Sequence, residues 1–194
     1  MLKIGIDIDN TIINTSVSVL DVHYEDTGER LYIDDITSYY MENFVSPQYR
    51  KDFHKLFHDK RVWKNVEVLP YCVETIRHLY NDGYELWFVT STTPENVLKK
   101  CNHLERTFPF LDIRKHFIVT PYKQMIDVDI LIDDCADNVV NSKHYSSILL
   151  DYPWNRDIDM DKNQNVFRVN GWQDVFQTVK FLEKFIKWQR RKST

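Results

Sequence analysis

The sequence has little glycine or proline, few cysteines and no long apolar run. Only four glycines and six prolines occur among its 194 residues, which argues against a fibrous or low-complexity chain. The three cysteines, Cys72, Cys101 and Cys135, lie far apart and form no CxxC pair. Neither a disulfide framework nor a zinc site is therefore expected. A reduced, cytoplasmic setting fits this cysteine usage best.

Other absences exclude two classes of partner. No apolar stretch approaches the roughly 20 residues that a membrane span requires, and the N-terminus lacks the charged and apolar regions of a signal peptide. The formal net charge of −4 gives no reason to expect nucleic-acid binding. We therefore predict a cytoplasmic globular protein that uses neither a membrane nor a nucleic acid as partner.

The chain does contain an alternation of short apolar strands with helices. Strand-like runs occupy residues 2–8, 84–90, 116–120, 129–134, 146–151 and 165–169. They lack strict polar alternation, which is typical of strands covered on both faces of a parallel sheet. Helical patterns lie between or after them, in "YCVETIRHLYNDG", "TPENVLKKCNHLERTF", "ADNVVNSKHY" and "WQDVFQTVKFLEKFIKWQ". The alternation predicts an α/β fold, a doubly wound parallel sheet with right-handed crossovers.

Residues 15–71 interrupt this alternation. They contain two helical patterns, "TSVSVLDVHYEDTG" and "SPQYRKDFHKLFHDKRVW", and many aromatic residues, but no convincing core strand. We predict a core domain of residues 1–14 and 72–194 with a helical cap, residues 15–71, inserted after the first strand. Such a cap would sit over the C-terminal edge of the sheet, where open α/β sheets bind ligands.

Polar side chains gather at the C-terminal ends of the first four expected strands. They are Asp7, Asp9, Thr11, Thr90, Ser91, Lys123, Asp133 and Asp134. Since these strand ends meet in one crevice of a doubly wound sheet, the side chains are expected to lie close together. Clustered carboxylates repel one another, and Mg²⁺ resolves the conflict because it prefers oxygen ligands and shares phosphate oxygens. Hydroxyls, a lysine and free loop amides suit the remaining phosphate oxygens.

The pair of carboxylates after the first strand suggests a reaction. One carboxylate can attack phosphorus and form an aspartyl-phosphate. A second, two residues on, can protonate the leaving oxygen and later activate water. The residues therefore predict a metal-assisted phosphoryl-transfer site.

The arrangement resembles the four motifs of the haloacid dehalogenase (HAD) superfamily of phosphatases. These are DxDxT after the first strand, a hydroxyl residue after the second, a later Lys, and paired Asp residues after the fourth. "YKQMIDVDILIDD" and "FVTSTTP" resemble the 5'(3')-deoxyribonucleotidase branch, and "DYPWNR" followed by "RVNGWQDV" is similar to its bacterial members. Together the motifs extend from residue 4 to about residue 175.

The resemblance implies a role for each acidic residue. Asp7 would be the nucleophile and a Mg²⁺ ligand, and Asp9 the general acid/base, with its backbone carbonyl on the metal. Asp133 would ligate Mg²⁺, with Asp134 and Thr11 in support.

The resemblance also implies a phosphate-binding set, in which Thr90 and Lys123 hold the phosphate and Ser91 assists. Two positions depart from the family pattern. Asn10 replaces the Gly that follows the second Asp, a mild change because Asn tolerates unusual backbone angles. Cys135 and the residue after it stand where human-type enzymes carry an Arg, which affects substrate preference.

The function implied is a Mg²⁺-dependent phosphomonoesterase that hydrolyses nucleoside 5'(3')-monophosphates, deoxypyrimidine nucleotides above all, through an aspartyl-phosphate. Aromatic residues of the cap are candidates for stacking on the base, since every base has a π-face. They are Tyr39, Tyr40, Phe44, Phe53, Phe57 and Trp63.

Two alternatives stay open. One is a HAD phosphatase for a sugar phosphate or another small phosphomonoester, because the cap sequence does not identify the substrate. The other is a non-catalytic phospho-acceptor or ligand-binding module such as a receiver domain, although receivers carry their acceptor Asp after the third strand. A homodimer through the cap or a sheet edge is also left open.

Overall fold

The structure is a computed structural model that describes residues 1–140, 142 and 145–192. Its six parallel strands form one sheet in the order β3-β2-β1-β4-β5-β6. The strands are β1 (Lys3–Ile6), β2 (Glu85–Thr90), β3 (Phe117–Val119), β4 (Ile130–Asp133), β5 (Ser146–Leu150) and β6 (Val166–Val169). Each lies within one of the expected runs, so the predicted α/β doubly wound class is confirmed.

Alternate residues along the strands face two separate hydrophobic clusters. The larger cluster contains Ile4 and Ile6 of β1 together with apolar residues of α4 (Cys72–Asn81), α5 (Pro94–Thr107) and α7 (Trp172–Lys192). The smaller one contains Leu131 and Leu149 on the opposite face, with Val139 of α6 (Ala136–Val139). Burial on both faces explains why the strands read as apolar runs without alternation.

One helix differs from expectation in its length. The pattern "ADNVVNSKHY" predicted a helix through residue 145, whereas α6 ends at Val139 because Val140 is extended, at φ −73° and ψ 140°. Residues 141, 143 and 144 of that prediction lie outside the described residues. The long C-terminal helix continues to Lys192, and residues 193–194 are likewise outside the described range.

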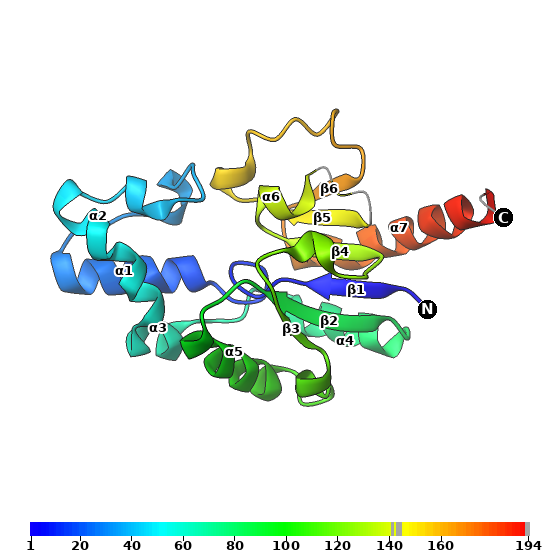
Figure 1. Ribbon diagram of the computed structural model, residues 1–194, viewed down its shortest axis with the longest axis horizontal. Helices are drawn as coiled ribbons and strands as arrows, with labels where there is room; N and C mark the ends of the chain where they lie inside the picture. The colour runs from blue at the N-terminus through cyan, green and yellow to red at the C-terminus, as the bar shows by residue number, and fades with distance from the viewer. Residues whose placement is uncertain (141, 143–144, 193–194) are drawn as a thin grey trace.

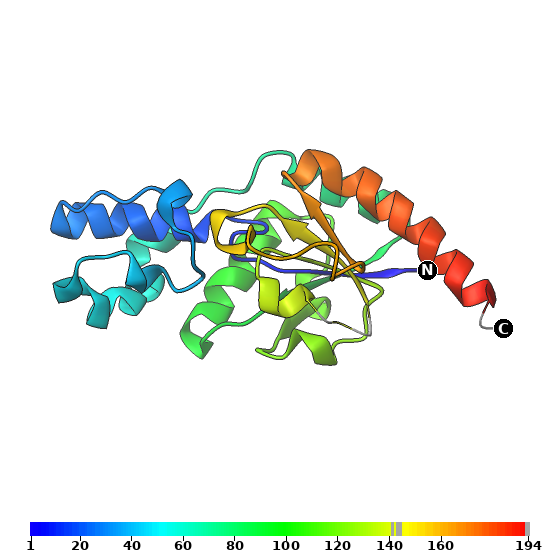
Figure 2. The same cartoon turned by 90° about the horizontal axis from the view of Figure 1, so that it is seen from above.

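The segment between β1 and α4 is helical and extends from one end of the sheet. It comprises α1 (Thr15–Thr27), η1 (Ile33–Asp35), η2 (Met41–Asn43), α2 (Pro47–Phe53), η3 (His54–His58) and α3 (Lys60–Asn65). Figures 1 and 2 show these elements beyond the C-terminal end of β1. The second expected helical stretch is divided because Asp59 is extended and its side chain accepts from the Arg61 N–H at 2.7 Å, which starts α3.

The two connections between this helical segment and the sheet run side by side. Ile13 forms an antiparallel bridge with Val68. The Asn14 N–H donates to the Glu67 carbonyl at 3.0 Å, and the Leu69 N–H donates to the Ile12 carbonyl at 2.8 Å. The helical segment therefore joins the core through one paired neck.

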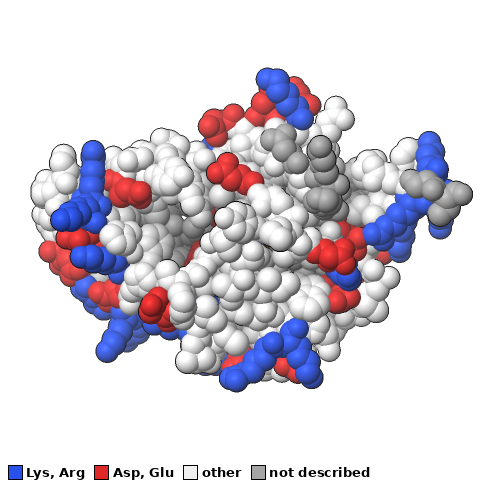
Figure 3. Space-filling model, viewed as in Figure 1, with Lys and Arg blue, Asp and Glu red and all other residues white. Residues whose placement is uncertain are grey.

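The surface carries charges of both signs. On the face seen in Figure 3, Lys and Arg side chains lie at the periphery and at the end of α7, with acidic residues between them. No helix in the described part of the chain combines the length and the apolar character needed to cross a membrane.

Trp172 anchors α7 to the loop after β1. Its indole is 1% exposed, and its Nε1–H donates to the Thr11 carbonyl at 2.6 Å. We expect Trp172→Ala to lower the free energy of unfolding by about 3–5 kcal/mol, as for other buried aromatic truncations. Urea denaturation measures this change. Trp188→Ala on the same helix, where Trp188 is 52% exposed, should cost less than about 1 kcal/mol; equal losses in the two variants would contradict the anchoring role.

Candidate active site

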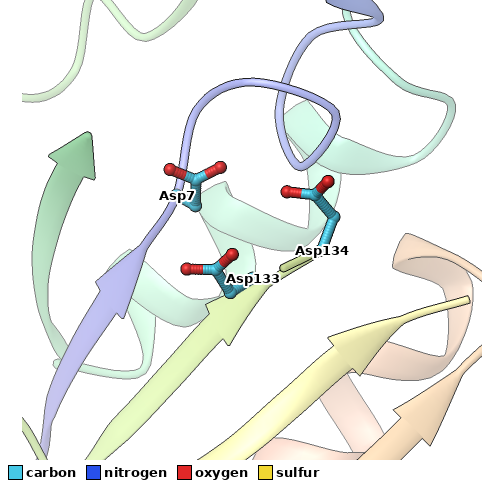
Figure 4. A group of neighbouring side chains, drawn as sticks. All are labelled: Asp7, Asp133 and Asp134. Atoms are coloured by element: carbon cyan, nitrogen blue, oxygen red, sulfur yellow. The ribbon is translucent and has the colours of Figure 1, made fainter. Parts of the chain in front are cut away.

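Asp7 and Asp133 lie side by side because β1 and β4 are parallel neighbours. Ile6 is in register with Ile132, so the next residue of each strand leaves the sheet at the same edge. Figure 4 shows Asp7 after β1, Asp133 at the end of β4 and Asp134 directly after it. One oxygen atom from each carboxylate lies within 4.8 Å of the others, and all three residues are buried. This spacing allows one cation to contact all three.

Lys123 supplies a positive charge to this cluster. It begins η5 (Lys123–Met125) and is 2% exposed. Its Nζ donates to Asp7 Oδ1 at 2.5 Å and to Asp133 Oδ2 at 2.7 Å. Burial by itself lowers the pKa of Lys123, but the charges of Asp133 and Asp7 outweigh this effect and raise the pKa above its ordinary value. Lys123 therefore stays protonated between the two carboxylates.

Burial has the opposite effect on the carboxyls. Desolvation raises the pKa of Asp7 to about 7, with Lys123 opposing the rise and Asp133 and Asp9 adding to it. Burial also raises the pKa of Asp134 well above its ordinary value, and the charges of Asp7 and Asp133 add to this effect. One lysine therefore does not balance all three carboxyls in their ionised form, and the raised pKa values express this imbalance.

Backbone and amide donors fix the orientation of Asp133. Its Oδ1 accepts from the Cys135 N–H at 2.9 Å, and Asn138 Nδ2 lies 3.1 Å from Oδ2. These donors hold the carboxylate at the position where β4 ends.

A second lysine, Lys100, belongs to the site and was not expected from the sequence. Its Nζ donates to Asp9 Oδ2 and, at 2.8 Å, to Thr90 Oγ1. The residue is 2% exposed and Thr90 is fully buried. Asp9 also accepts from the Thr15 hydroxyl at 2.7 Å. Lys100 therefore connects two residues that the sequence assigned to acid/base chemistry and to phosphate binding.

The spacing of the buried residues in α5 could have revealed Lys100. Asn96, Lys100 and Leu104 are the buried residues of this helix and recur every four positions. They therefore share one helix face. A lysine on the same face as a core leucine indicates a buried partner of opposite charge.

The remaining expected residues lie at different depths. Asn10 has a φ of 53°, which confirms that it adopts a conformation favoured by Gly. Thr11 is fully buried and its Oγ1 has no hydrogen-bond partner among the described residues. Its carbonyl binds Trp172, so Thr11 supports the loop. Ser91 is exposed and lines a cavity beside Asp9.

This cavity has a volume of about 350 Å³ and lies between the helical segment and the strand ends. That volume is at the lower end of the range for small-molecule sites. Its aromatic lining residues are Tyr39, Phe57, Trp63 and Trp154. Asp9 and Trp154 belong both to the cavity wall and to the surroundings of the carboxylate cluster. A phosphate at the cluster would thus leave the rest of a small ester in the cavity.

The aromatic candidates of the helical segment separate into two groups. Tyr39, Phe57 and Trp63 line the cavity, whereas the buried Phe53 belongs to the hydrophobic core. Tyr40 is 62% exposed, and Phe44 packs against the core. Neither of these two lines the cavity.

Tyr39 lines the cavity, and more than half of the residue is exposed. Burial of its hydroxyl raises the pKa of Tyr39, and the charge of Asp134 raises it further.

Helix α5 also contacts the helical segment. Asn96 Nδ2 donates to the Phe57 carbonyl at 3.0 Å, and Lys99 Nζ donates to the His58 carbonyl at 3.1 Å. The Lys99 ammonium lies 5.7 Å from the centroid of the Trp63 ring. Helix α5 therefore contacts the cavity wall through Asn96 and Lys99, and it contacts Asp9 and Thr90 through Lys100.

The chemistry of the donor set suits a divalent cation. Asp7, Asp133 and Asp134 offer only hard oxygen atoms, without a His or Cys in the group. Such sets favour Mg²⁺, Ca²⁺ or Mn²⁺ over softer metals. A cation would also offset the excess negative charge that Lys123 leaves unbalanced.

The comparisons with known proteins agree with this geometry. Residues 1–185 match the family described as 5' nucleotidase, deoxy (pyrimidine), cytosolic type C protein (NT5C). The chain belongs to this family. It is therefore a phosphoric monoester hydrolase of the 5'-nucleotidase type, within the HAD superfamily, and acts on small phosphomonoesters.

One curated relative is similar to this chain in sequence, and two solved structures are similar to it in fold. The 5'(3')-deoxyribonucleotidase of Clostridium acetobutylicum is 26% identical over 184 residues, covering 94% of this chain and 97% of that protein. A HAD family hydrolase from Deinococcus radiodurans, solved with phosphate and sodium, has a TM-score of 0.59 at 12% identity, covering 93% of this chain and 96% of that one. A hydrolase from Pseudomonas syringae has a TM-score of 0.56 at 14% identity, with coverages of 93% and 99%. The two structures show the fold.

The raised pKa of Asp7 predicts how stability depends on pH without metal. The folded pKa of about 7 lies above the ordinary value of 3.8, so the folded state binds more protons between these values. Its stability must then fall as the pH rises through that window. Asp7→Asn mimics the neutral carboxyl and removes this loss. We expect the variant to gain more than about 1 kcal/mol on the wild type between about pH 4 and pH 7.

Urea denaturation in EDTA across this pH range measures the gap between variant and wild type. Asp129→Asn is a suitable control because Asp129 lies at the opposite end of β4, where it accepts from the Lys3 N–H at 2.7 Å. If the difference in unfolding free energy between Asp7→Asn and the wild type stays constant or shrinks as the pH rises, Asp7 ionises normally in the folded protein.

Proposed function

We propose that the protein is a Mg²⁺-dependent nucleotidase that hydrolyses nucleoside 5'(3')-monophosphates, deoxypyrimidine nucleotides above all. The observation that supports this best is the position of the buried Asp7–Lys123–Asp133 cluster beside an aromatic-lined cavity. The family description and the name of the Clostridium relative support the nucleotide class.

Within this proposal the phosphate binds among the cationic and hydroxyl groups. Lys123, Thr90 and Lys100 provide buried donors, and Ser91 lies at the cavity side. Ammonium groups that now bind carboxylates can donate to phosphate oxygens instead, since charge-assisted bonds to phosphate are strong. This arrangement binds the dianion without exposing it to solvent.

Asp7 is the proposed nucleophile. Its carboxylate oxygen attacks phosphorus, and the bond from phosphorus to the ester oxygen breaks. Asp9 protonates the departing alcohol as general acid. A water molecule then attacks the aspartyl-phosphate while Asp9 takes its proton, which releases phosphate and restores Asp7.

Asp7, the Asp9 carbonyl and Asp133 would hold the Mg²⁺, with Asp134 and Thr11 in support. When bound, the ion supplies charge stabilisation to the transferring phosphoryl group. The oxygen-only donor set fits this ion.

Residues 15–71 are proposed to act as a cap that selects the leaving group and excludes bulk water. Tyr39, Phe57 and Trp63 line the cavity, and aromatic rings stack on any base. A sugar phosphate remains the second candidate substrate because the cavity also contains the polar side chains of Ser91 and Thr92. The cytoplasmic location remains a prediction, and a homodimer is left open.

Phosphate release from a panel of nucleoside monophosphates and sugar phosphates, with Mg²⁺ or EDTA, tests this proposal. We expect Mg²⁺-dependent release that is fastest with dUMP or dTMP, and no release above background from Asp7→Asn. Circular dichroism checks that this variant remains folded. Preference for a sugar phosphate would overturn the nucleotide assignment, whereas equal release in EDTA would overturn the dependence on Mg²⁺.

Lys100 and Lys99 provide a matched pair for testing the phosphate site. Lys100→Met removes the ammonium beside Asp9 and Thr90, and we expect kcat/KM to fall by about 100-fold, as when one transition-state donor is lost. Lys99→Met removes a contact to the helical segment, so its effect should fall mainly on KM. Steady-state kinetics separates the two. Equal kinetic changes in both variants would exclude a direct role for Lys100.

A further inference from the structure

We propose that Trp154 is a positioning residue for Asp134, and that it connects the wall of the cavity to the cation site. This inference rests on the proposed function only in assuming that the carboxylate cluster binds Mg²⁺. It concerns the loop after β5, which includes η6 (Pro153–Asn155).

The indole of Trp154 points its N–H at Asp134. Nε1 lies 3.2 Å from Asp134 Oδ2 and 3.3 Å from the Asp134 carbonyl. Trp154 is 8% exposed and Asp134 is 3% exposed. Among the described residues, this N–H is the group that donates a hydrogen bond to the Asp134 carboxylate. The direction of that carboxylate therefore depends on the indole.

Asn155, the residue after Trp154, binds the backbone next to this contact. Asn155 is fully buried, and its Nδ2 donates to the carbonyls of Asp134 and Leu150, both at 2.8 Å. Arg168 of β6 donates through Nη1 to Asn155 Oδ1 at 2.5 Å and through Nη2 to its carbonyl at 2.7 Å. The loop is thus tied to three strands, β4, β5 and β6, so it holds the indole rigidly.

The ring of Trp154 serves a second purpose. Tyr152 stacks on it with ring centroids 4.3 Å apart and planes at 9°, which fixes its tilt. The ring also lines the cavity beside Asp9 and Tyr39. One side chain therefore contacts the carboxylate cluster through its N–H and also lines the cavity.

Asp134 is one of the three clustered carboxylates, so a donor that orients it affects the cation site. The loss of such a donor typically weakens metal affinity or activity by about 10- to 100-fold. Trp154 differs from a simple wall residue in this respect, because a wall residue would change substrate binding and leave the affinity for Mg²⁺ unchanged.

Trp154→Phe removes the N–H and keeps an aromatic face. Titration calorimetry without nucleotide should show that Mg²⁺ binds at least about 10-fold more weakly than to the wild type. Raising the Mg²⁺ concentration should then restore the rate of phosphate release. Trp87→Phe is the matched control, because Trp87 Nε1 donates to Glu85 at 2.9 Å, and it should bind Mg²⁺ like the wild type.

The outcomes separate this inference from the proposed function. Mg²⁺ affinity of Trp154→Phe equal to that of the wild type, with an altered KM, would overturn the positioning role and leave Trp154 as a wall. A wild-type protein that binds no Mg²⁺ would also overturn it. Failure to hydrolyse nucleotides would overturn the proposed function while the metal comparison still stands.

A second measurement avoids the variant if it does not fold. In the wild type, the indole ¹H–¹⁵N signal of Trp154, assigned through its contacts with Tyr152, should shift as Mg²⁺ saturates the site. The Trp87 signal should stay in place. A Trp154 signal that does not respond to Mg²⁺ would overturn the proposal.

Discussion

Three buried carboxylates with one ammonium group beside them are the constraint on which the rest of the structure depends. Asp7, Asp133 and Asp134 are each at most 5% exposed, and Lys123 contacts two of them. Unbalanced charge in such a place is costly. The surrounding structure is arranged to limit that cost, with backbone and amide donors on Asp133 and an indole donor on Asp134. The same imbalance makes the cluster receptive to a cation.

The site divides between segments with different tasks. The carboxylates and Lys123 come from strand ends whose position the sheet register determines. The aromatic walls come largely from the helical segment and from the loop after β5. Helix α5 connects the two parts, since Lys99 contacts a carbonyl of the helical segment and Lys100 contacts Asp9. A change in the position of this helix would therefore move both the cavity wall and the contact between Lys100 and Asp9.

Much of this arrangement was predictable because it follows from local patterns. Short apolar strands with polar residues at their ends determine both the sheet and the convergence of Asp7, Lys123 and Asp133. Lys100 was missed because it stands next to Lys99 in an ordinary charged helix, where only its position four residues before the core Leu104 distinguishes it. The short α6 depends on a single extended residue, Val140.

The aromatic residues of the helical segment show the same limit. Phe53 and Phe57 are four positions apart, yet Phe53 is buried in the core, whereas Phe57 packs against the core and also lines the cavity. A helix changes to a 3₁₀ helix between them, at His54, and this rotates the second ring relative to the first. Composition and spacing do not reveal such a change, because it depends on contacts with α1 and α5.

The paired neck at Ile13 and Val68 has a consequence for how this kind of enzyme diversifies. Both crossings of the helical segment lie next to each other, hydrogen-bonded at residues 12–14 and 67–69. The sheet therefore needs only two adjacent chain ends to be complete. A gene could exchange residues 16–66 for another segment without altering strand order, and Thr15, whose hydroxyl donates to Asp9, would stay in place in a descendant with different selectivity.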